Sequence, residues 1–171
     1  MMKKVILSLV FVLGSLFYVG AQEKTILDVS QAQVVNLVVD FSNASIHNMD
    51  ENAFSTYEPS YAKGKNEVIA KLVEEFNDEE KVGFILGNFP KADYTVKVNV
   101  VSVSRKGDML SNAEILDIDG NVIATISGIK GDGGTFGSNM NLMGDGCKST
   151  GEALAKRMAK MIKVEKKKAK Q

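Results

Sequence analysis

Four stretches of the chain carry the hydrophobic patterns of β-strands. Residues 34–41 are β-branched and almost continuously apolar, which predicts a buried strand rather than a half-exposed one. Residues 94–103 alternate apolar and polar side chains, so one face of that strand contacts a core and the other faces water. Residues 110–118 and 122–129 are predicted to form a hairpin, because Asp119-Gly120 between them accepts the positive φ of a tight turn. The last three strands are therefore expected to be consecutive and antiparallel.

Two amphipathic helices are expected besides the strands. Residues 66–77 carry one apolar stripe at helical spacing, with Asn66 as the N-cap. A closing helix is expected to begin at Ser149, because Ser149 and Glu152 fit a capping box. The apolar side chains of its stripe are Leu154, Met158, Met161 and Ile162.

Two segments between these elements are predicted to be loops. Residues 42–65 are rich in Asn, Ser and Gly, and we expect Phe54, Tyr57 and Tyr61 to hold this loop against the body. Residues 131–146 are glycine-rich, which is typical of a flexible loop.

The predicted order of elements is β-α-β-β-β-α. It favours an α+β fold of two layers, a mainly antiparallel sheet with the helices packed on one face and Lys97 and Asn99 on the open face. The chain contains no repeat and no sign of a second domain. We therefore expect one domain over residues 22–171.

Residues 1–21 have the three parts of a secretory signal peptide. Lys3 and Lys4 precede an apolar run, and small residues end it at Gly20-Ala21. Cleavage between Ala21 and Gln22 predicts a periplasmic or extracellular protein. An uncleaved membrane anchor is the alternative, although the apolar run is short for a span. Since residue 22 is not cysteine, no lipid anchor is expected and the mature protein is predicted to be soluble.

Charge and cysteine usage narrow the choice of partners. The formal net charge is 0, with 21 basic and 21 acidic residues, which gives no argument for a nucleic-acid partner. Cys147 is the one cysteine, so no internal disulfide forms. A buried thiol is expected, while an intermolecular disulfide and the oligomeric state stay open.

The glycine-rich loop is the leading candidate for a binding site, because it leads into a helix N-terminus. The nucleotide-binding pattern G-x-x-x-x-G-K-[ST] fails, because Leu142 and Cys147 stand where its two glycines belong. No cofactor is therefore predicted, and a general anion-binding role stays open. The candidate ligand-binding residues are Asp132, Phe136, Ser138, Asp145 and Lys148.

The remaining candidate residues give no catalytic or metal site. His47, the only histidine, lies in a polar loop and is expected to be exposed. The acids Asp117 and Asp119 fit a hairpin turn rather than a calcium loop. Catalysis by a carboxylate pair such as Asp132 and Asp145 stays open, because such pairs leave no local signature.

The basic run Lys163–Lys170 has two interpretations. It can contact anionic lipid headgroups, or it can be a solvated helix end whose lysines complement the helix dipole. The sequence favours the second interpretation.

The segments "VVNLVVDFSNAS", "GGTFGS" and "GEALAKRMAKMIK" resemble envelope proteins of the CsgG and TolB amino-terminal-domain type. The Ala21-Gln22 pair that follows the apolar run resembles the same region of exported proteins of the Bacteroidetes. The resemblance implies a small α/β envelope domain that acts through protein contacts rather than catalysis. We therefore expect a non-catalytic exported protein that binds a protein or an envelope component. The alternative is a small-ligand or anion binder, or a hydrolase, that uses the loop 131–146.

Overall fold

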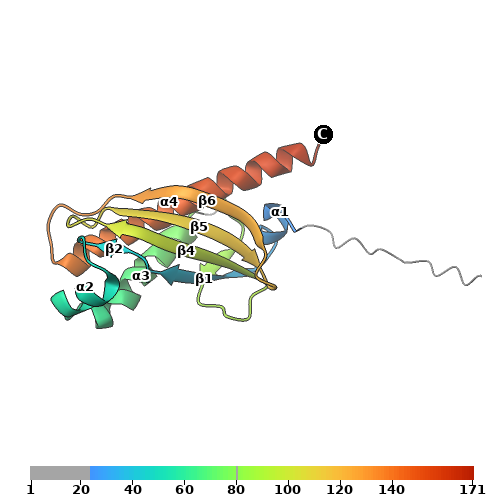
Figure 1. The fold of residues 1–171 in the computed structure, drawn as a ribbon. Helices are drawn as coiled ribbons and strands as arrows, with labels where there is room; N and C mark the ends of the chain where they lie inside the picture. The colour runs from blue at the N-terminus through green and yellow to red at the C-terminus, as the bar shows by residue number, and fades with distance from the viewer. Residues whose placement is uncertain (1–23, 80) are drawn as a thin grey trace, which may run out of the picture.

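The computed structural model describes residues 24–79 and 81–171. One six-stranded mixed sheet is backed by two long helices, α3 and α4, and two short helices lie at its ends (Figure 1). The elements are α1 (Ile26–Val29), β1 (Val34–Asp40), β2 (Ser45–Ile46), α2 (Glu51–Tyr57), α3 (Tyr61–Asn77), β3 (Ile85–Gly87), β4 (Tyr94–Val103), β5 (Met109–Asp117), β6 (Val122–Gly131) and α4 (Asn139–Lys168). This confirms the α+β class and the two-layer arrangement.

The strand order in the sheet is β3-β1-β4-β5-β6, with β2 also paired to β4. The longest pairings, β4 with β5 and β5 with β6, are antiparallel as expected. The strand β1 pairs in parallel with both β3 and β4. The chain reaches β3 and β4 from β1 only after α3, and a helical crossover of this kind brings the next strand back in parallel.

The core lies between the inner face of the sheet and the two long helices. The helix α3 contributes Val68, Leu72 and Phe76, each at most 3% exposed. The buried side chains of α4 include Met143, Cys147, Leu154, Met158 and Ile162. Both helical stripes are therefore buried against the same face, as the pattern predicted.

The strand β1 is less buried than its apolar run predicted. Val35 is fully buried, whereas Val38 is 42% exposed on the other face of the sheet. No helix of residues 24–79 and 81–171 packs over that outer face, where Lys97 forms a salt bridge with Asp40 at 3.5 Å. The prediction of a buried strand was wrong because a β-branched run suits any central strand, whether or not its second face is covered.

The closing helix begins ten residues before its predicted start. Ser138 is the N-cap of α4, and its hydroxyl oxygen accepts a hydrogen bond from the Asn141 N–H at 3.2 Å. The predicted capping box at Ser149 therefore lies inside the helix, where Thr150 donates to the Gly146 carbonyl at 2.8 Å. Glycines lower helix propensity, but here they serve close packing, as described below.

The predicted loop over residues 42–65 contains β2, α2 and the first turns of α3. Asp50 caps α2 by accepting the Ala53 N–H at 2.8 Å. Phe54 and Tyr61 hold this segment to the body, being 0% and 2% exposed. Tyr57 does not, since it is 61% exposed.

Within residues 24–79 and 81–171, no helix combines the length and the apolar character that crossing a membrane requires. The predicted signal peptide lies outside the described residues.

Candidate functional site

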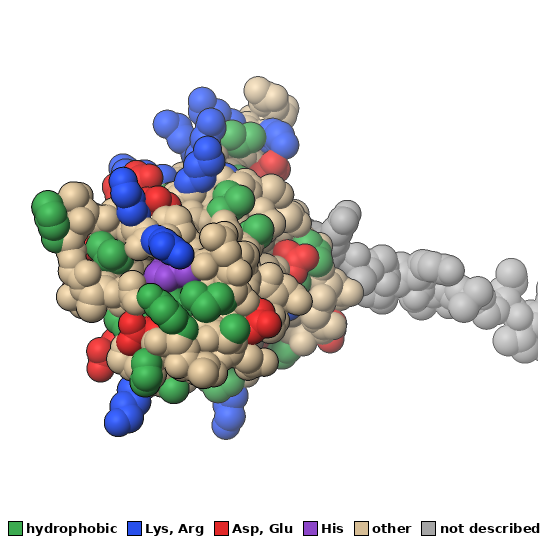
Figure 2. Space-filling view, turned by 60° about the vertical axis from the view of Figure 1, so that its left-hand side comes forward, with side chains coloured by type: hydrophobic (Ala, Val, Ile, Leu, Met, Phe, Trp, Pro, Cys, Tyr) green, Lys and Arg blue, Asp and Glu red, His purple; other side chains and the backbone are tan. Residues whose placement is uncertain are grey.

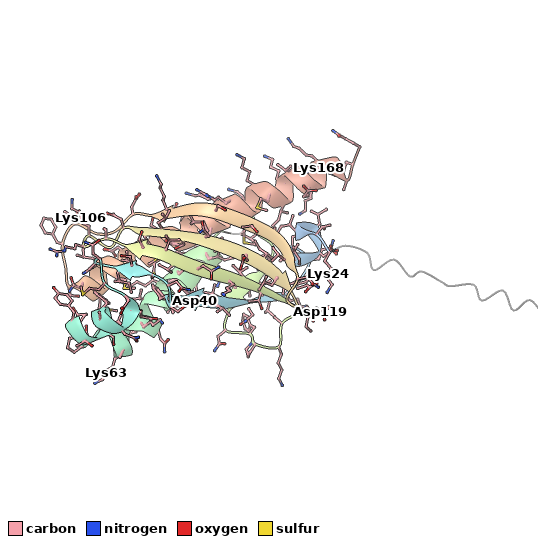
Figure 3. The ribbon with its side chains drawn as sticks, viewed as in Figure 1. Lys24, Asp40, Lys63, Lys106, Asp119 and Lys168 are labelled. Atoms are coloured by element: carbon pink, nitrogen blue, oxygen red, sulfur yellow. The ribbon has the colours of Figure 1, made fainter. Side chains whose placement is uncertain are left out.

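Three segments that are distant in sequence meet at one end of the molecule. They are the β4–β5 turn (residues 104–108), the glycine loop (residues 132–138) and α2, and we call this region the loop end. The Gly133 N–H donates to Asp108 Oδ1 at 3.0 Å, and Asn139 Nδ2 donates to Glu58 Oε2 at 3.0 Å. Lys106 marks this end in Figure 3, with Asp119 at the opposite end of the sheet.

The β4–β5 turn is fixed by its own side chains. Ser104 Oγ donates to Asp108 Oδ2 at 2.8 Å, and the Gly107 N–H donates to the Ser104 carbonyl at 2.9 Å. The N–H of Gly133 and the hydroxyl of Ser104 stabilise the carboxylate and hold the pKa of Asp108 below its ordinary value. Asp108 therefore anchors the glycine loop as an ion.

Glycines in this region allow backbones to touch. Gly107 has φ +84°, and a Cβ there would overlap the Leu142 carbonyl of α4. A Cβ on Gly146 would overlap the Gly107 carbonyl, and one on Gly133 would overlap the Lys106 carbonyl. The glycines thus bring α4 and the glycine loop against the turn, and residues 139–148 are helical rather than a phosphate-binding loop.

Phe136 projects from the glycine loop. It is 89% exposed, although the loop on both sides of it is held by Gly133 and by the capping residue Ser138. Tyr57 of α2, 61% exposed, lies at the same end of the molecule. Figure 2 looks toward this end and shows hydrophobic side chains on its surface.

The five candidate ligand-binding residues do not line one pocket. Asp132 borders a hollow of about 390 Å³, together with Ser104, Asp108 and Lys130. Ser138 is used as a helix cap. Asp145, which belongs to α4, lies against Gly134 and does not line that hollow. Lys148 points toward α3, where it forms a salt bridge with Glu75 at 3.4 Å.

His47 is buried, which corrects the prediction of an exposed loop histidine. It is 8% exposed, and its ring meets the edge of Phe54 with centroids 4.9 Å apart. Its backbone has φ +53°, and its N–H donates to the Val103 carbonyl at 2.9 Å. Burial, followed by the nearby charge of Arg105, lowers the pKa of His47. The contact with Phe54 depends on β2 and α2, which the sequence pattern did not reveal.

A polar cluster that sequence reasoning missed joins α2 to α3. Glu51 Oε1 accepts hydrogen bonds from Tyr61 Oη at 2.7 Å and from Lys65 Nζ at 2.5 Å. Burial opposes ionisation of Glu51, but these two donors outweigh it and lower the pKa of the carboxyl. Burial and the Glu51 charge raise the pKa of Tyr61. The cluster stabilises the packing of the two helices.

Cys147 is fully buried on α4. Burial raises the pKa of its thiol to about 12, and the Lys71 charge offsets only part of this effect. The expectation of a buried thiol is confirmed. Among the described residues, no group of three His, Cys, Asp or Glu side chains is arranged to hold a metal ion.

No protein-family model and no curated protein matches this chain. Among solved structures, a PelC variant from Paraburkholderia phytofirmans, described as a dodecamer, aligns with 74% of this chain and 88% of its own at 11% identity and a TM-score of 0.37. A DUF330 protein from Xanthomonas campestris aligns with 80% of this chain and 88% of its own at 10% identity and a TM-score of 0.38. Both TM-scores are below 0.5, so this chain is similar to these proteins only in coarse outline, and we transfer no function from them.

Proposed function

We propose that this protein is a non-catalytic binding module, exported by its N-terminal segment, that docks another protein through the loop end. The observation that carries the proposal is Phe136, an aromatic side chain 89% exposed at the tip of an anchored loop. Arg105 and Lys106 are exposed on the adjacent turn. Aromatic side chains and arginine are enriched in protein–protein interfaces, and arginine is common among their hot spots.

Energetics favour Phe136 as the anchor of this interface. Transfer of a Phe side chain from water to an apolar pocket is worth about 1.5–3 kcal/mol. The hydrogen bonds from Gly133 to Asp108 and from Asn141 to Ser138 hold the two ends of the loop before a partner arrives. Because the loop is held in place, less conformational entropy is lost on docking.

Site-specific photo-crosslinking in the native host tests the proposal. A photoreactive phenylalanine analogue placed at Phe136 is expected to give one discrete adduct with another protein. Ile118, 64% exposed on the β5–β6 turn, is the matched control at the opposite end of the sheet and should give none.

Binding to the crosslinked partner, once purified, gives a quantitative second measurement. The Phe136→Ala substitution is expected to weaken binding by about 2 kcal/mol or more. Equal crosslinking from positions 136 and 118, or unchanged affinity of Phe136→Ala, would remove the loop end as the docking site.

A second candidate function is the binding of a small polar ligand. It is favoured by the hollow of about 390 Å³ beside the turn, where Lys130, Asp132 and Ser104 supply both charges and a hydroxyl. Native mass spectrometry of the protein purified from its host should then show a retained ligand, lost in Lys130→Ala. A spectrum that shows only the mass of the polypeptide, with no bound ligand, would contradict this candidate function.

A further inference from the structure

Four lysines follow one face of the end of α4, and a fifth lies just past the C-cap Ala169. They are spaced four, three, four and three residues apart, which keeps side chains on one side of a helix. At 1.5 Å per residue the row is about 21 Å long. We call this row the lysine stripe: Lys156, Lys160, Lys163, Lys167 and Lys170. All five line one hollow of about 560 Å³, together with Lys81 and Glu79. Glu79 forms a salt bridge with Lys81 at 3.3 Å rather than with a lysine of the stripe.

The stripe carries little compensating negative charge. Among the described residues, Lys156 is the one member in a salt bridge, with Glu152. Like charges three and four residues apart destabilise a helix. The end of α4 therefore retains a repulsion that an anionic surface would relieve.

The side of the helix end next to the stripe carries apolar side chains. Met161 and Val164 line a second hollow of about 450 Å³ together with Ile26 and Ile123, and the charged Lys24, Lys160 and Glu165 border it as well. Val164 is 43% exposed. A helix with lysines on one side and exposed apolar side chains on another is typical of segments that lie in the headgroup region of a membrane.

Positive charge is concentrated at the C-terminal end of the chain, and the rest of the chain carries a net negative charge. Residues 156–171 hold eight of the 21 lysine and arginine residues and one of the 21 acids, so this end carries +7 and the remainder −7. Figure 2 shows Lys and Arg side chains gathered at the upper edge, and Figure 3 places Lys168 far from Lys106 of the loop end. An anionic surface would attract one end of the molecule and repel the rest.

We infer that the lysine stripe docks this protein on a surface of anionic phospholipids, with the sheet and the loop end held away from the bilayer. The sequence alone favours solvation for the basic run. The structure adds the shared face, the hollow lined by the lysines and the apolar side chains beside them. The apolar side chains favour a lipid surface over a soluble polyanion, which offers nothing to cover them.

Vesicle flotation tests the inference. The mature protein is expected to bind vesicles of phosphatidylcholine with about 30% phosphatidylglycerol, and not vesicles of phosphatidylcholine alone. Replacing the five stripe lysines with Gln should lower the partition coefficient by roughly 3,000-fold, since each lysine near an anionic bilayer contributes about a fivefold factor. Raising NaCl from about 50 to 500 mM should release the wild-type protein.

A matched variant separates the stripe from net charge. Lys63→Gln with Lys91→Gln removes two exposed lysines elsewhere and should leave binding within about twofold, because these positions lie off the stripe. Lys163→Gln with Lys167→Gln removes the same charge from the stripe and should lower the partition coefficient by about 25-fold. Circular dichroism of both variants checks that the fold is retained.

Three results would overturn the inference. The first is absence of vesicle binding by the wild-type protein. The second is an equal loss in the two double Gln variants. The third is binding of dextran sulfate or DNA through the stripe without binding to vesicles, which would make a soluble polyanion the ligand.

Discussion

Cys147 illustrates how a side chain's position determines its chemistry. A lone cysteine in an oxidising compartment can form disulfides between chains, but this thiol is fully buried and its pKa is raised to about 12. The thiolate is the reactive form. At pH 8 we expect Cys147 to react with a thiol reagent roughly a thousandfold more slowly in the folded protein than after denaturation. Absorbance at 412 nm with Ellman's reagent measures this, and rapid native labelling would contradict the buried placement.

His47 makes stability depend on pH near neutrality. Burial lowers its folded-state pKa below the ordinary 6.5, so below pH 6.5 the unfolded chain binds a proton that the folded protein does not. The free energy of unfolding should therefore fall as the pH drops from 7.5 to 5.5, by at most about 1.4 kcal/mol per pH unit. Arg105 opposes protonation as well, while Glu58 and the Ser104 backbone favour it.

The His47→Asn variant isolates this contribution. Asn tolerates the positive φ at this position and does not titrate. Urea unfolding at the two pH values should give a smaller pH effect for the variant than for the wild-type protein. Carboxyl groups with lowered pKa, such as Asp108 and Glu58, titrate at lower pH and leave the comparison unaffected. Equal pH effects in the two proteins would show that folding does not change the proton uptake of His47 over this pH range and would contradict its lowered pKa.

At the scale of elements, the close approach of α4 to the β4–β5 turn depends on Gly146. Ala normally favours a helix over Gly by about 1 kcal/mol. At Gly146 the added Cβ would overlap the Gly107 backbone carbonyl, which cannot rotate away. We expect Gly146→Ala to lower the free energy of unfolding by about 1–3 kcal/mol, measured by urea denaturation.

Gly144 is the matched control two residues earlier in the same helix. A Cβ there would meet the flexible end of the Lys71 side chain, which can move aside. Gly144→Ala should therefore be neutral or stabilising by up to about 1 kcal/mol. Similar destabilisation by both substitutions would indicate a general intolerance of the helix rather than the specific contact at Gly107.

The sequence predicted the elements whose signals are local. The strand Tyr94–Val103 begins and ends where its alternation placed it, and the turn at Asp119-Gly120 joins β5 to β6 with Gly120 at φ +83°. The start of α4 was missed because the glycines at 144 and 146 placed this stretch in the predicted loop 131–146. Gly146 is needed for the close approach to the Gly107 carbonyl, which is distant in sequence.

The candidate site was predictable only in part, for the same reason. The glycine-rich stretch 131–146 stood out from its composition, and Phe136 was among the candidate residues, although only residues 132–138 of it form the loop. Its relation to the β4–β5 turn depends on the hydrogen bond between Gly133 and Asp108, 25 residues apart. Hydrophobic periodicity and helix-capping patterns relate residues that are only three or four positions apart in the sequence. They therefore cannot reveal a contact between residues 25 positions apart.

At the scale of the whole molecule, the lysine-rich helix end is separable from the fold. Ile162 is the last buried residue of α4, and residues 165–171 lie beyond the core. Deleting residues 165–171 removes four lysines and one acid, so the net charge falls by three.

We expect the free energy of unfolding to stay within about 0.5 kcal/mol of the wild-type value, because surface residues away from packed contacts contribute little. Anion-exchange elution should move to higher salt. A loss of stability above about 1 kcal/mol would show that this end braces the core, and its lysines would then have a structural reason to be present. An unchanged stability leaves the lysines of residues 165–171 with a role outside the fold, which is what docking on an anionic surface requires.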